Sequence, residues 1–223
     1  MLTMSNNVGF RVQLEGSVGN ALCLSCCGGE SALLTHYHIL PGNGFRGDVL
    51  IAPSLPGEVA LLEVTPEHTW SVQQCGFVAC DQSVDVCTRI QRLTRCAVAV
   101  QPQSRSQAFL TRCTRRRCCC AGEGFVILKC SGRGRLIVNS FGSICRYDVK
   151  AGEQRVVDNG ALVAWSDHMQ PIIKLAASGA LTSLFSGEGF VCVFTGPGTV
   201  YVQTRAVSGL GYALAATGLK RMA

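Results

Sequence analysis

The chain repeats itself, and this limits what it can fold into more than any other feature of the sequence. The segment GEGFVCVFTGPGTVYVQT at 187–204 recurs as GEGFVILKCSGRGRLIVNS at 122–140 and, more weakly, as GESALLTHYHILPGNGFRGDVLIAPS at 29–54. Each copy runs from Gly-Glu through β-forming residues and a glycine-rich turn to a second β-forming run. This order predicts three β-hairpins, whose turns are Gly-Pro-Gly, Gly-Arg-Gly and a longer Pro-Gly-Asn-Gly loop.

A second repeated module precedes each of these segments. VQQCGFVACDQSVDVCTRI at 72–90 aligns with VVDNGALVAWSDHMQPIIKL at 156–175, at an offset of 85 residues that matches Phe77 to Leu162. The first four residues of the chain fit the position of Phe77 to Cys80. The sequence therefore predicts one all-β domain over 1–205, built from three β-sandwich-like repeats at about 1–63, 64–147 and 148–205. A Gly/Ala-rich tail follows at 206–223.

The first repeat is predicted to be incomplete at its N-terminal end. The second and third repeats begin with LLEVTPEHTWSV and RYDVKAGEQRVV, both of which indicate a strand, a turn and a strand, and the first repeat has no counterpart. An unpaired strand edge invites pairing with another chain. We therefore expect either further sequence upstream, which leaves any targeting signal undecided, or a homo-oligomer.

Composition supports a packed protein that associates with itself. Charged residues make up 15% of the chain and the mean hydropathy is +0.27, which excludes an intrinsically disordered chain. The same values predict more apolar surface than a monomer normally exposes. No uncharged apolar run approaches the ~20 residues of a membrane helix, so we expect no transmembrane segment.

The net charge of +6 is concentrated in one segment. Eight arginines and no Asp, Glu or Lys lie between Arg89 and Arg117. Such a tract could bind RNA, anionic lipid or an acidic partner, and the residues of this candidate patch are Arg105, Arg112, Arg115, Arg116 and Arg117. A solvated insertion is the alternative we favour, because the tract lacks the interleaved aromatic residues on which single-stranded bases stack.

Fourteen cysteines, without a recognisable secretory signal, indicate reduced thiols rather than a disulfide framework. Most of them, such as Cys130 and Cys192, lie in apolar strand segments where cysteine behaves as a small hydrophobic residue. Two clusters differ from the rest: Cys23, Cys26 and Cys27, and the adjacent run at 118–120. Neither has the paired C-x2-C spacing of a zinc site.

Two other groups of residues are weak candidates for binding a metal. Glu30, Glu123 and Glu188 occupy equivalent positions in the three repeats, so pseudo-symmetry could gather three carboxylates around one cation. His36 and His38 lie two apart in a strand and project from the same face. Structural roles are the favoured interpretation of both groups, and no cofactor is predicted.

The sequence contains no motif that indicates catalysis. Gly-x-Ser-x-Gly, His-Glu-x-x-His and Walker A patterns are all missing. Gly132-Arg133-Gly134 and Gly196-Pro197-Gly198 are rich in glycine but lie between predicted strands, whereas a phosphate-binding loop begins a helix. No catalytic residue is therefore assigned, and a metal-dependent enzyme that uses His36 and His38 or a cysteine cluster remains an unfavoured alternative.

Three stretches of the chain resemble the altered-inheritance-of-mitochondria family of the AIM twenty-four type. GEGFVCVFTGPGTVYVQTR at 187–205 resembles the closing motif of that family, DVLIAPSLPGEVALLEV at 48–64 its first-repeat exit, and LIVNSFGSICRYDVKAGEQRVVDNGALVAW at 136–165 its centre. The resemblance covers residues 1–205. It implies an all-β fold grouped with the tryptophan RNA-binding attenuation protein, in which three sandwich units are arranged with pseudo-threefold symmetry. It implies no established enzymatic activity.

The chain departs from this family in lacking the first strands and in carrying arginine and cysteine runs in its middle connector. Taken together, the repeats, the low charge and the resemblance predict a non-enzymatic, self-associating scaffold that organises protein partners at a mitochondrial or other membrane, with a role in mitochondrial organisation implied by the resemblance. Binding of RNA or anionic lipid through Arg89–Arg117 is the alternative function. We expect an intracellular location, in the mitochondrion or the cytoplasm.

Overall fold

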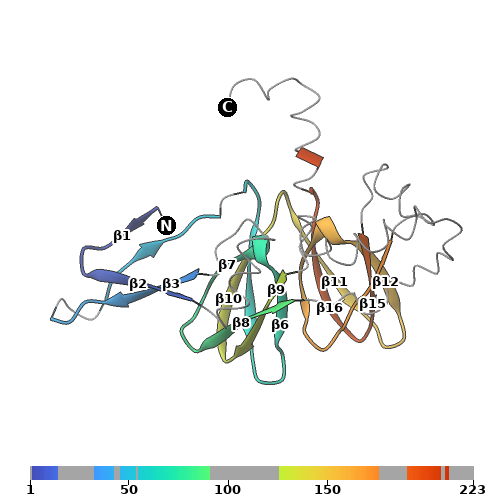
Figure 1. Ribbon diagram of the computed structural model, residues 1–223, viewed down its shortest axis with the longest axis horizontal. Helices are drawn as coiled ribbons and strands as arrows, with labels where there is room; N and C mark the ends of the chain where they lie inside the picture. The colour runs from blue at the N-terminus through green and yellow to red at the C-terminus, as the bar shows by residue number, and fades with distance from the viewer. Residues whose placement is uncertain are drawn as a thin grey trace, which may run out of the picture.

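The computed structural model describes residues 2–14, 33–42, 46–53, 55–90, 126–175, 190–206 and 209–210 (Figure 1). In these residues the secondary structure is almost entirely β, with two short 3-10 helices, η1 (Gln74–Gly76) and η2 (Asn159–Ala161). The predicted all-β fold class is confirmed. No helix in the described part is long and apolar enough to cross a membrane.

The strands follow one another in four groups along the chain. The N-terminal strands are β1 (Thr3–Met4), β2 (Val8–Leu14), β3 (Leu33–Ile39) and β4 (Val49–Leu50). The next are β5 (Val59–Val64), β6 (Trp70–Gln73), β7 (Phe77–Cys80) and β8 (Val84–Ile90). They are followed by β9 (Val126–Gly132), β10 (Gly134–Asn139), β11 (Ile144–Val149) and β12 (Gln154–Asp158). The last are β13 (Leu162–Ser166), β14 (Ile172–Leu175), β15 (Phe190–Thr195) and β16 (Gly198–Gln203).

Strands β5 to β16 form two sandwiches that share one long sheet. This sheet has six strands in the order β11-β16-β13-β6-β9-β8. Its β6-β9-β8 half packs against the sheet β5-β10-β7, which completes the central sandwich. Its β11-β16-β13 half packs against β12-β15-β14 and completes the C-terminal sandwich (Figure 1). One continuous sheet therefore joins the two sandwiches.

The two sandwiches use the same pairing pattern. In the central sandwich β10 lies between β5 and β7, and in the C-terminal sandwich β16 lies between β11 and β13. The central strand of the other sheet is β9 in the first case and β15 in the second. Both β7 and β13 also have an irregular register at equivalent points. Phe77 and Ala79 of β7 lie opposite adjacent residues of β10, and Leu162 and Ala164 of β13 lie opposite adjacent residues of β16. Residues 70–90 thus correspond in position to residues 155–175.

The predicted hairpins are wrong. Strands β9 and β10 flank Gly132-Arg133-Gly134 but belong to different sheets, and so do β15 and β16 on either side of Gly196-Pro197-Gly198. The antiparallel partners of β9 are β6 and β8, and β8 precedes it by a long segment of sequence. The glycine-rich turns therefore carry the chain from one sheet of a sandwich to the other, and sequence periodicity cannot distinguish such a crossing from a hairpin.

Gly132 shows why the crossing needs glycine. Its φ is +110°, a backbone conformation that side chains rarely adopt. A Cβ atom at this position would lie 2.5 Å from the carbonyl oxygen of Ser83. The close approach of the two backbones at the end of β9 therefore requires a residue without a side chain.

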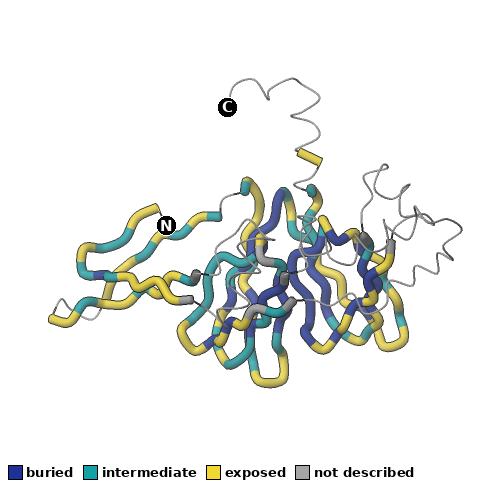
Figure 2. Tube along the Cα trace, in the orientation of Figure 1, coloured by how far each residue is buried: buried dark blue, intermediate teal, exposed yellow. Residues whose placement is uncertain are grey.

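Each sandwich contains a core of its own. The first core cluster includes Leu62, Trp70, Val72, Leu136 and Val138, all of them buried in the central sandwich. The second includes Trp165, Ile173, Phe194 and Val200 in the C-terminal sandwich. Figure 2 shows the buried residues in dark blue. It also shows that the N-terminal strands β1 to β4 are mostly exposed or half-buried.

Candidate functional site

The junction between the sandwiches brings together residues from distant parts of the chain. Strand β6 pairs antiparallel with β13, with Val72 opposite Ala164, Ser71 opposite Trp165 and Trp70 opposite Ser166. The indole of Trp70 packs edge-on against Tyr201, with ring centroids 5.6 Å apart. Backbone pairing and side-chain packing therefore both connect the two sandwiches.

The core clusters also exchange residues across this junction. Ile127 of the central sandwich is buried in the second core cluster. Ala164 and Tyr201 of the C-terminal sandwich are buried in the first. Because each core is completed by the neighbouring unit, joining sheets through β6 and β13 removes apolar surface from water on both sides.

Asp167 lies directly after β13 and contacts two basic side chains and a hydroxyl group of the central sandwich. Its carboxylate accepts a hydrogen bond from the hydroxyl of Ser71 at 2.6 Å and lies 2.8 Å from the Nζ of Lys129 and 3.2 Å from a guanidinium nitrogen of Arg89. Burial favours the neutral form and raises its pKa. The hydrogen bonds from Lys129 and Ser71 and the charge of Arg89 outweigh that effect, so the pKa of Asp167 lies below its ordinary value.

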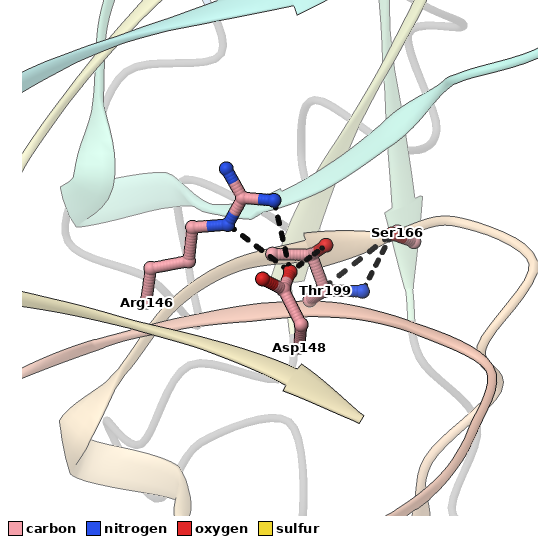
Figure 3. Close-up of polar contacts among 4 residues, drawn as sticks. All are labelled: Arg146, Asp148, Ser166 and Thr199. Atoms are coloured by element: carbon pink, nitrogen blue, oxygen red, sulfur yellow. Dashed lines mark hydrogen bonds and ion pairs between the residues drawn. The ribbon is translucent and has the colours of Figure 1, made fainter. Parts of the chain in front are cut away.

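A second polar network lies on the C-terminal sandwich (Figure 3). The guanidinium of Arg146 donates two hydrogen bonds of 3.0 Å to Oδ1 of Asp148, which also accepts one of 2.7 Å from the hydroxyl of Thr199. The bonds from Thr199 and Arg146 lower the pKa of Asp148. The backbone N–H of Thr199 donates to Oγ of Ser166 at 3.1 Å. These contacts connect β11, β16 and β13.

The arrangement around Ser166 does not resemble an activated nucleophile. Its hydroxyl is buried and bonded to the backbone of Thr199 on both the donor and the acceptor side. The nearby His168 contacts the carbonyl oxygen of Pro197 through Nε2 at 2.7 Å. A nucleophile would need a base within hydrogen-bonding reach of its hydroxyl. This network therefore holds strands β11, β13 and β16 together.

The structure describes only some of the candidate metal ligands. His36 and His38 lie in β3, opposite Arg11 and Gly9 of β2. Within the described ranges, no group of three or more His, Cys, Asp or Glu residues is placed so that it could hold a metal ion. Glu30, Glu123 and Glu188 lie outside the described residues.

Most of the arginine tract also falls outside these residues. Arg89 is described, in β8, and it lies beside Asp167. The positions outside the description are the candidate patch, Arg105, Arg112, Arg115, Arg116 and Arg117, together with the cysteine clusters at 23–27 and 118–120 and nearly all of the tail at 206–223.

The two apolar cysteines are core residues. Cys130 and Cys192 are buried, as the strand pattern predicts. Burial raises the pKa of each thiol to about 12, because the thiolate would lose its hydration. Both thiols are therefore protonated and unreactive at neutral pH.

Apolar side chains on outer strands are the feature that sequence analysis did not locate. Val156 of β12 is 63% exposed and Ile172 of β14 is 47% exposed. Val59 and Leu61 of β5, and Phe10 and Val12 of β2, are also exposed. In the described part of the two sandwiches, the outermost strands of the sheets are β5, β7, β8, β11, β12 and β14. Alternation within a strand predicts two faces, but it cannot tell which face remains uncovered.

Comparisons with known proteins agree with this architecture. The chain is 27% identical over 192 residues to an uncharacterised protein of Streptococcus pyogenes serotype M6, an alignment that covers 86% of this chain and 64% of the relative. The chain thus spans about two thirds of the length of that relative. A crystal structure of a protein from Streptococcus pyogenes shares the fold, with a TM-score of 0.71 and 24% identity over 97% of this chain and 85% of that one.

A family model shows where the chain belongs. The model described as mitochondrial biogenesis AIM24 matches residues 1–205, the same range that the sequence resemblance covers. The match includes both sandwiches and the N-terminal strands. The chain is therefore a member of the AIM24 mitochondrial biogenesis family.

Proposed function

We propose that this protein is a non-enzymatic scaffold that associates with itself and positions partner proteins. The observation that carries the proposal is the way in which the chain joins its own units. Two sandwiches are joined edge to edge through β6 and β13, and each contributes side chains to the core of the other. The same kind of edge, with apolar side chains exposed, is present on the outer strands.

The polar networks support a structural role. The carboxylates of Asp167 and Asp148 are both committed to contacts that hold strands or sandwiches together. A catalytic carboxylate would more commonly lie in a cleft with a pKa adjusted toward neutrality, whereas the pKa of each of these groups is lowered. A role in mitochondrial organisation is proposed from family membership alone.

The mass of the untagged protein in solution tests the proposal. Light scattering behind size exclusion is expected to give a discrete multiple of 23.7 kDa that does not change between low and moderate salt. Association through strand edges and apolar surface depends little on ionic strength, whereas binding to nucleic acid is lost steeply as salt rises. A monomer at tens of micromolar would contradict the proposal. A heterogeneous species that absorbs as nucleic acid and dissociates in salt would favour the arginine tract instead.

A further inference from the structure

Strand β12 occupies the position in its sandwich that β6 occupies in the central one. Each lies beside the middle strand of its sheet, β15 for β12 and β9 for β6. On its other side β6 pairs with β13, and this pairing connects the sandwiches. In the described residues β12 has no strand on that side. Of these two equivalent edges, only that of β6 has a partner in the described residues, and there it joins two sheets.

An apolar row runs across the sheet to this edge. Val156 of β12 is opposite Val193 of β15, which is opposite Ile172 of β14. In the central sandwich the corresponding row is Ser71, Lys129 and Cys87, and the first two of these contact Asp167 of the neighbouring sandwich. Apolar residues thus replace polar ones where no neighbour is described.

The edge of β12 is complementary to itself. If two copies approach antiparallel with Val156 opposite Val156, Gln154 of each copy lies opposite Asp158 of the other. An amide can donate to a carboxylate, so no like charges are opposed. Arg155 alternates to the other face, where its guanidinium lies 4.1 Å from the ring centroid of Tyr147. Nothing charged therefore interrupts the valine row.

We propose that β12 pairs with β12 of a second copy of this chain, with Val156 opposite its counterpart. This inference rests on the proposed function and specifies its interface. Pairing would produce a six-stranded sheet in the order β14-β15-β12-β12-β15-β14 and extend the apolar row across a two-fold axis. A contact of this kind uses the same surface on both copies and closes as a dimer.

Strand β1 of the same chain does not supply the missing partner, because it lies at the opposite end of the molecule from β12 (Figure 1). The partner that we consider for β12 is therefore a strand of a second copy.

The first test is the variant Val156→Lys in the full chain. A lysine here meets solvent in a monomer but a second lysine in the proposed dimer, so the dissociation constant should rise about tenfold or more. The matched control is Val59→Lys, which places the same charge on β5, another outer strand, where Val59 is 53% exposed. The control should keep the dissociation constant of the wild type. Circular dichroism checks that both variants are folded.

The second test locates the contact directly. A photoreactive benzoylphenylalanine at position 156, in a mixture of light and ¹⁵N-labelled chains, should cross-link to residues 154–158 of a chain with the other label. Cross-links to residues 2–5 or 77–81 would overturn the inference in favour of pairing with β1 or β7.

The outcomes separate the inference from the proposed function. A wild-type oligomer that Val156→Lys leaves intact would overturn the pairing of β12 and retain the scaffold. A wild-type monomer would overturn both.

Discussion

At the scale of single residues, the contacts of Asp167 hold strands of the two sandwiches in position. Asp167 is buried and contacts three side chains, each from a different strand of the central sandwich. Arg89, the first arginine of the basic tract, is one of them. Arg89 therefore neutralises a carboxylate of the neighbouring sandwich.

Replacing Asp167 with Asn should destabilise the protein. The change leaves Lys129 and Arg89 near one another without a counter-charge, and we expect a loss of about 1–3 kcal/mol in the free energy of unfolding. Urea unfolding at pH 7 measures it. The matched control is Asp81→Asn, which removes an exposed carboxylate paired with Arg135 and should have a much smaller effect.

The difference in stability between the wild type and Asp167→Asn should depend on pH. Because the pKa of Asp167 in the folded protein is lowered from 3.8, its contribution is present above that value and is lost as pH falls through the folded pKa. The difference between wild type and Asp167→Asn should therefore be constant near neutrality and shrink below about pH 4. A difference that grows on acidification would contradict the assigned ion pairs.

Cysteine reactivity should follow burial. Cys87 is exposed, whereas Cys130 and Cys192 are buried and have pKa values raised to about 12. Brief treatment with iodoacetamide at pH 8, followed by peptide mass spectrometry, should modify Cys87 well before the two core thiols. Early modification of Cys130 in folded protein would show that the central core opens more readily than its packing indicates.

At the scale of elements, the turns between β9 and β10 and between β15 and β16 decide the architecture. They cross from one sheet to the other, and so place consecutive strands on opposite sides of a core. Long connections instead join strands that pair, such as β8 and β9. Stability consequently depends on backbone geometry at a few glycines.

Gly132→Ala should therefore cost more than Gly152→Ala. Both glycines have positive φ, +110° and +80°, so either substitution introduces about 1 kcal/mol of backbone strain or more. Only Gly132 has a backbone atom 2.5 Å from the new Cβ, while Gly152 has nothing within 4 Å. Thermal unfolding of both variants measures the difference, and equal losses would show that the crossing relaxes without cost.

At the scale of the whole molecule, the sandwiches should unfold as one unit. They share a six-stranded sheet, and the side chain of Gln73 donates across the junction to the carbonyl oxygen of Asn159 at 2.9 Å. Neither core is complete without its neighbour, since Ile127 and Tyr201 are exchanged. Separate unfolding would expose apolar surface on both units.

The two tryptophans of the chain allow this to be measured. Trp70 is in the first core cluster and Trp165 in the second, and both are buried. The single-tryptophan variants Trp165→Phe and Trp70→Phe should each give one fluorescence transition, at the same denaturant concentration as its own circular dichroism transition. A fluorescence midpoint that departs from circular dichroism in either variant would show that the sandwiches unfold independently.

The sequence by itself determined the all-β class, the family and the correspondence of residues around Phe77 to those around Leu162. These follow from alternation and from local repetition, which depend only on neighbours along the chain. Burial of Cys130 and Cys192 was predictable for the same reason.

Only the tertiary structure decided which strands share a sheet, which carboxylates hold strands together and which strand edges are open. A glycine-rich turn permits a hairpin or a crossing, and packing of the core selects between them. Ser71 and Asp167 are 96 residues apart in sequence, so no spacing predicts their contact. Exposure of Val156 depends on what packs against its face of the sheet, and that is set by the arrangement of whole sheets.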